Sequence, residues 1–91
     1  MKSVFKFAVV AAAIGFAPAA FASPECTAKP QSEWLTQEQM KAIIAKMDFK
    51  DVKVFQVSGS CYEIYAHTKD GQRAEIYFNP VTGEVVEKNV D

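Results

Sequence analysis

The chain has 91 residues, of which 10 are basic and 11 acidic, so its formal net charge is −1. This length allows one small domain, and the mild, mixed charge argues against nucleic acid or an anionic membrane surface as a partner. One histidine and two cysteines also leave the chain poor in the residues that build catalytic or zinc sites.

Residues 1–22 have the three parts of a secretory signal peptide. Lys2 and Lys6 give a positive start, an apolar run follows, and Ala20 to Ala22 form a small-x-small cleavage motif. The apolar run is too short for a membrane span, which needs about 20 apolar residues. We therefore predict a bacterial protein that is periplasmic or secreted, with a mature domain at residues 23–91 and no membrane contact after cleavage; an uncleaved anchor is the alternative.

Both cysteines, Cys26 and Cys61, lie in the predicted mature part. An exported chain with an even number of cysteines most simply forms a disulfide, and this one would stabilise the fold by roughly 3 to 4 kcal/mol in the chain-entropy model. A redox-active or metal-binding pair is the alternative. It is disfavoured because the cysteines are far apart in sequence and have no histidine nearby.

An amphipathic helix is predicted from Thr36 to about Met47, after an extended lead-in at residues 23–33 that contains two prolines. Thr36 is a typical N-cap, and Gln39, three residues on, can return a hydrogen bond to it. The apolar residues recur at the three- and four-residue spacing of one helix face. They are Met40, Ile43, Ile44 and Met47.

The segment from Cys61 to Val86 predicts a β-hairpin and a further strand. Apolar and polar residues alternate on both sides of Lys69-Asp70-Gly71, and the apolar sets share a face only if Ile64 pairs with Ile76. This register needs a three-residue loop with Gly71 in the left-handed conformation. After a turn around Pro80, a short last strand is expected at residues 84–86, and residues 87–91 are expected to fray because they carry no apolar pattern.

Residues 52–57 predict another strand, whose register has two solutions. A two-residue Gly59-Ser60 turn places Phe55 and Val57 in the core, whereas a three-residue turn would place Val52 and Val54 there. We favour the first solution because it buries the larger side chains. The predicted fold class is α+β, with one helix packed on a three- to four-stranded antiparallel sheet.

The sheet face turned away from the helix is the candidate binding surface. Aromatic rings beside carboxylates on an uncovered sheet are typical of protein-binding surfaces, and the sheet edges could add an extended peptide as a strand. The alternative is that these residues only stabilise a solvated face by cross-strand pairing. The predicted binding residues are Val54, Glu63, Tyr65, Arg73, Glu75 and Tyr77.

Residue types for catalysis are scarce in the mature part. His67 is predicted on the outward face opposite Arg73, and Ser58 and Ser60 lie in a turn with no base in sequence reach. The aspartates are scattered and form no calcium loop. We therefore predict no catalytic residues, no metal site, no cofactor and no enzyme activity.

The mature chain resembles the PepSY domain, in particular its small exported stand-alone form. The resemblance rests on Gly59-x-Cys61-Tyr62-Glu63-Ile64-Tyr65-Ala66, on Lys69-Asp70-Gly71, and on the run from Ile76 to Val86. It implies an envelope or secreted protein that binds another protein, such as a peptidase that it modulates or inhibits. This sequence departs from a propeptide in having no protease attached. The alternative function is a small-molecule or metal-ion binder of the envelope, with Glu63 and Glu75 as ligands.

Overall fold

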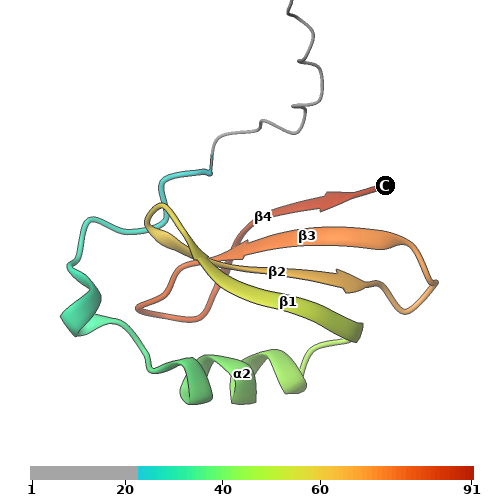
Figure 1. Cartoon of the computed structure of the whole chain (residues 1–91), viewed down its shortest axis with the longest axis horizontal. Coiled ribbons are helices and arrows are strands. Elements are labelled where there is room, and N and C mark those ends of the chain that lie inside the picture. The colour runs from blue at the N-terminus through green and yellow to red at the C-terminus, as the bar shows by residue number, and fades with distance from the viewer. Residues whose placement is uncertain (1–22) are drawn as a thin grey trace, which may run out of the picture.

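A computed structural model describes residues 23–91; the predicted signal peptide at residues 1–22 lies outside the described residues. The strands form one antiparallel sheet in the order β1-β2-β3-β4, and Figure 1 shows α2 running along the β1 side of it. The α+β fold predicted from the sequence is confirmed. In chain order the elements are η3 (Gln31–Glu33), α2 (Gln37–Ala45), β1 (Lys50–Ser58), β2 (Cys61–His67), β3 (Arg73–Phe78) and β4 (Val85–Val90).

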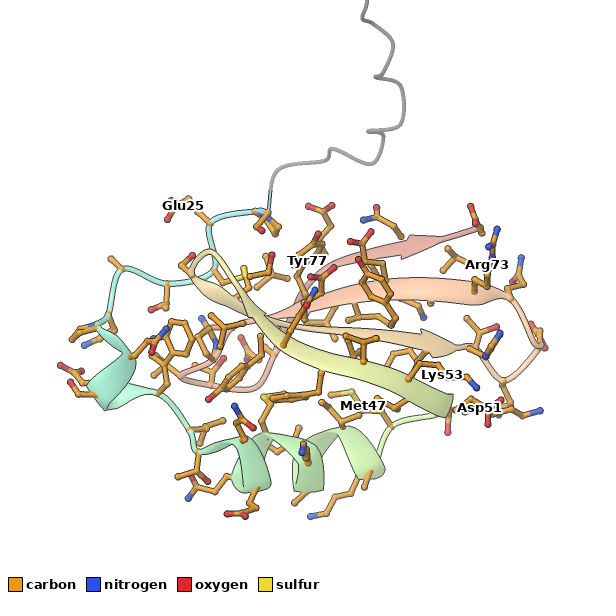
Figure 2. All side chains as sticks on the ribbon, in the orientation of Figure 1. Glu25, Met47, Asp51, Lys53, Arg73 and Tyr77 are labelled. Carbon is orange, nitrogen blue, oxygen red and sulfur yellow. A yellow bond between two sulfur atoms is a disulfide. The ribbon has the colours of Figure 1, made fainter. Side chains whose placement is uncertain are left out.

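Helix α2 begins at the predicted cap. The Thr36 hydroxyl accepts a hydrogen bond from the Gln39 backbone N–H at 3.1 Å, and the Gln39 side chain accepts one from the Thr36 N–H at 2.8 Å. The helix ends at Ala45, earlier than predicted, but Met47 still packs on the core from the following turn (Figure 2). No helix within residues 23–91 is long and apolar enough to span a bilayer.

The β2–β3 hairpin has the predicted register and turn. Ile64 pairs with Ile76, the Thr68 N–H donates to the Gln72 carbonyl at 2.8 Å, and Gly71 has a φ of 88°. A side chain at Gly71 would be strained at this φ, which is why the bulged turn needs glycine. Ile64 and Ile76 therefore point to one face of the sheet, and their neighbours along each strand point to the other face.

The β1–β2 hairpin confirms the favoured register but not all of its consequences. Phe55 pairs with Ile64, and its ring lies 5.0 Å from the Tyr62 ring, against the core. Val57 shares that face, yet 43% of it is exposed, so its predicted burial is wrong. Val57 lies next to the β1–β2 turn on an edge strand, and Figure 1 shows this turn at a distance from α2.

The core lies between α2 and the face of the sheet that we call the inner face. The Tyr62 hydroxyl, at the margin of this core, donates to the Leu35 carbonyl at 2.7 Å, so its polar end is satisfied. Trp34 stacks edge-on against the Tyr62 ring at 5.3 Å. The buried core residues are Met40, Ile44, Tyr62, Ile64, Ala66, Ala74, Ile76 and Phe78.

The C-terminal residues do not fray, which corrects the prediction for residues 87–91. Strand β4 extends to Val90, and the Asp91 N–H donates to the Arg73 carbonyl at 2.9 Å. The Asp91 carboxylate also pairs with the Arg73 guanidinium at 2.7 Å. An edge strand can be polar because its backbone ladder, and not an apolar side-chain pattern, attaches it to the sheet.

Candidate functional site

The predicted binding residues share the face of the sheet opposite the core, which we call the outer face. Alternation along the strands aligns them in two cross-strand rows. One row is Val54, Tyr65, Glu75 and Asn89; the other is Gln56, Glu63, Tyr77 and Glu87. His67 pairs with Arg73 at the end of the face, as predicted. The structure thus brings the predicted set together, and it adds Gln56, Glu87 and Asn89 as neighbours.

One end of the outer face is covered by the lead-in. The predicted disulfide joins Cys26 to Cys61 with a Cα–Cα distance of 5.2 Å, and the two cysteines form a second buried cluster with Tyr77. The Cys26 N–H also donates to the Ser60 hydroxyl at 2.8 Å. Because Cys61 belongs to the outward-pointing set of β2, its bridge holds the lead-in against this face.

The structure corrects the predicted exposure of two binding residues. Glu63 is only 2% exposed and Tyr77 only 3%, whereas both were expected to face solvent. The sequence held a usable signal for this result, because Cys61 alternates in phase with Glu63. A partner cysteine bonded to Cys61 has to approach from the outer side and bring its own chain segment with it.

Glu63 is a buried acid in a nearly closed environment. The Gln56 side-chain amide donates to Glu63 Oε1 at 2.9 Å, while Glu63 Oε2 is buried without a hydrogen-bond partner among the described residues. Burial raises the pKa of Glu63, and its contact with the Glu75 carboxyl raises that pKa further. The same contact lowers the pKa of Glu75. A proton is therefore favoured on Glu63 over Glu75.

The two tyrosines of the outer face differ in role. The Tyr77 hydroxyl donates to Glu75 Oε2 at 2.8 Å. Burial is the largest cause that raises the pKa of Tyr77, and this hydrogen bond raises that pKa further. Tyr77 therefore holds the Glu75 carboxylate in place. Tyr65 is 44% exposed and pairs across the strands with Glu75; the negative charge of nearby Glu63, ionised at high pH, raises the pKa of Tyr65. Tyr65 is the aromatic side chain of this face that a partner can reach.

A hollow of about 650 Å³ lies beside Tyr65 and Glu75, toward the β2–β3 turn. Two of its basic groups are paired: Arg73 lies 2.7 Å from Asp91, and His67 Nδ1 lies 3.7 Å from an Asp51 carboxylate oxygen. A third, Lys53, lines the hollow and is in none of the ion pairs among residues 23–91. Figure 2 shows Arg73 at the end of the sheet where β3 begins and β4 ends. The lining includes Tyr65, His67, Arg73, Glu75, Asn89 and Asp91.

Few chemical groups are available on this face. Within residues 23–91 no three or more His, Cys, Asp or Glu side chains are grouped so that they could hold a metal ion. The two cysteines are closed in a disulfide. The remaining groups are an exposed ring, a hydrogen-bonded carboxylate and a hollow, which can bind a side chain of another protein.

The family model described as "peptidase propeptide and YPEB domain", PepSY_2, matches residues 6–89. The chain belongs to the PepSY family. The helix and four-stranded sheet described above are thus the structure of a PepSY domain in this chain, in which the segment from Gly59 to Val86 covers β2, β3 and the start of β4. The family is linked to peptidase propeptides and to interactions with peptidases. No curated protein and no solved structure gives a match.

Proposed function

We propose that this protein is an exported PepSY module that binds a protein of the cell envelope through its outer face and modulates or inhibits it. A secreted or periplasmic peptidase is the partner that the family favours. In this proposal residues 1–22 are removed on export, and residues 23–91 act as a free domain in the periplasm or outside the cell.

The observation that carries the proposal is the exposed Tyr65 ring beside the fixed Glu75 carboxylate at the edge of the hollow. Aromatic side chains contribute strongly to protein interfaces because they bury a large area with few rotatable bonds. No helix within residues 23–91 covers this face, so a flat or convex partner surface can reach it.

The direct experiment is affinity capture from a periplasmic extract with residues 23–91 immobilised. Wild-type protein is expected to retain a peptidase or another envelope protein, and Tyr65→Ala is expected to lose most of it. The retained peptidase is then assayed for inhibition by each variant.

Val57→Ala is the matched control, because Val57 is exposed to the same degree as Tyr65 but belongs to the inner-face side of β1. It is expected to capture the partner as wild type does. Equal capture by the Tyr65 variant and by wild type would exclude the outer face as the binding surface. Tyr77 is a poor probe because it is buried against the disulfide, so its removal would disturb packing.

A further inference from the structure

The outer face carries acidic groups without basic partners. The ion pairs among residues 23–91 use Lys29 with Glu33, His67 with Asp51, Lys69 with Asp48, and Arg73 with Asp91. None of them includes Glu63, Glu75 or Glu87. Like charges on one sheet face repel one another unless a cation or a proton lies between them.

The buried carboxyl gives a second, independent indication. Glu63 Oε2 has no hydrogen-bond donor among the described residues, although Glu63 is only 2% exposed. A buried carboxylate oxygen without a donor is costly. Burial and the neighbouring Glu75 carboxyl both raise the pKa of Glu63, which favours its protonated form.

We propose that the partner presents a basic side chain, arginine or lysine, which lies over the Tyr65 ring and pairs with the Glu75 carboxylate. The inference rests on the proposed function, since it assigns the chemistry of the partner at the same face. Tyr65 lies directly across the strands from Glu75, so one cation can contact the ring and the carboxylate together. The hollow beside them gives the side chain room to enter.

The other groups near Glu63 do not replace that cation. Strand β1 contributes the neutral Gln56 amide, and β4 contributes Glu87, whose carboxylate accepts from the Asn89 amide at 3.0 Å. Lys53 of β1 lines the hollow with Tyr65 and Glu75, but none of the ion pairs among residues 23–91 joins it to Glu63 or Glu75. Strand β3 contributes the Tyr77 hydroxyl, which is used by Glu75, while Arg73 is paired at the far end. The charged residues of the lead-in are Glu25, Lys29 and Glu33; all are exposed, and Lys29 pairs with Glu33.

Binding of the basic side chain is therefore linked to pH. Below the raised pKa of Glu63 the pair keeps its proton, and the incoming cation has to displace it. Above that pKa the second carboxylate is already ionised and attracts the cation. Affinity should increase with pH, with a slope that approaches about one proton released per side chain bound.

The test uses a glycine pentapeptide with a central arginine, titrated into isotope-labelled residues 23–91 and followed by NMR from pH 4.5 to pH 8. We expect shifts of the Glu63, Tyr65 and Glu75 amides and a dissociation constant that falls with pH. The lysine analogue should act in the same way, and the uncharged citrulline analogue should bind at least about tenfold more weakly.

Three variants refine the result. Glu75→Gln should weaken binding of the arginine peptide at least about tenfold, Tyr65→Leu should weaken it about threefold, and Glu63→Gln should remove its pH dependence. Native-like spectra of each variant establish that it is folded. Equal binding of the citrulline peptide, or an affinity independent of pH in wild type, would overturn the inference.

These outcomes separate the inference from the proposed function. If the basic peptides do not bind but the captured envelope protein still requires Tyr65, the outer face binds a protein by other chemistry, and only this inference fails. If the captured protein is also indifferent to Tyr65, both fail.

Discussion

The two faces of the sheet are buried by different means. The inner face is covered by α2 through apolar contact with residues such as Ile64 and Phe78, which are fully buried. The outer face is covered at one end only, by a lead-in that one disulfide holds, and is open at the other around Tyr65. Apolar burial therefore sets the stability of one face, while a single covalent bond and a few hydrogen bonds set the shape of the other.

The largest expected effect is on the inner face. Phe78→Ala should lower the free energy of unfolding by about 3 to 5 kcal/mol, because it leaves a cavity in the core. Val54→Ala on the outer face, which is 36% exposed, should cost less than about 1 kcal/mol. Urea unfolding of both variants measures the difference, and similar costs would contradict the contrast between the faces.

The second effect removes the cover of the outer face. Replacing Cys26 and Cys61 together with alanine should lower stability by about 3 to 4 kcal/mol and expose Tyr77. Thermal unfolding and solvent accessibility of the Tyr77 ring by NMR measure the two results. Ser60→Ala is the matched control: it keeps the disulfide and removes the hydroxyl that accepts from the Cys26 N–H at 2.8 Å and from the Thr27 N–H at 3.5 Å, and it should cost about 1 kcal/mol. An unchanged melting temperature in reductant would show that the bridge adds no stability.

The third effect is a dependence of stability on pH, which arises from the carboxyls of the outer face. Because the folded-state pKa of Glu63 is raised above its ordinary value of 4.5, the folded state keeps a proton that the unfolded chain releases. The Glu63 contribution to stability is therefore complete below about pH 4.5 and is lost as the pH rises through the folded-state pKa. The lowered pKa of Glu75 acts in the opposite sense, and its contribution is lost as the pH falls below 4.5.

Glu63→Gln should remove the loss at higher pH, because a neutral amide can donate to Glu75 without ionising. At pH 8 this variant should be more stable than wild type by roughly 1 kcal/mol. Unfolding curves at a series of pH values measure the effect. A wild-type profile that stays flat from pH 4.5 to pH 8 would show that the pair holds no proton.

The smallest effect concerns the helix that covers the inner face. Thr36→Ala removes one half of the capping box at the start of α2 and should lower stability by about 1 kcal/mol. Thr36→Ser keeps the hydroxyl and should be close to wild type. Both are measured by thermal unfolding, and equal melting temperatures for the two variants would show that the cap is unimportant here.

Local rules predicted most of the fold. Thr36 with Gln39, Gly71 in the bulged turn and the pairing of Ile64 with Ile76 all follow from short-range patterns, and all are confirmed. The polar strand at residues 87–90 did not follow, because its attachment to β3 depends on backbone hydrogen bonds that side-chain patterns do not report.

The sequence predicted which residues share the candidate site, but not which of them are exposed. Alternation placed Glu63, Tyr65, Glu75 and Tyr77 on one side of the sheet, and the pairing confirms it. Alternation reports which side a residue takes and not what lies above it, so the burial of Glu63 and Tyr77 was missed.

The sequence by itself determined the helix start, the register of the β2–β3 hairpin, the disulfide and the two faces, because each depends on residues close in the chain or on a bond between the only two cysteines. Only the tertiary structure decided which part of the outer face stays open. That outcome depends on where a segment 35 residues away in sequence comes to lie, and the lead-in has no periodic pattern that specifies its path. The lead-in, held by the disulfide, packs with Tyr77, whereas Tyr65 stays exposed beside Glu75 as the group that a partner can reach.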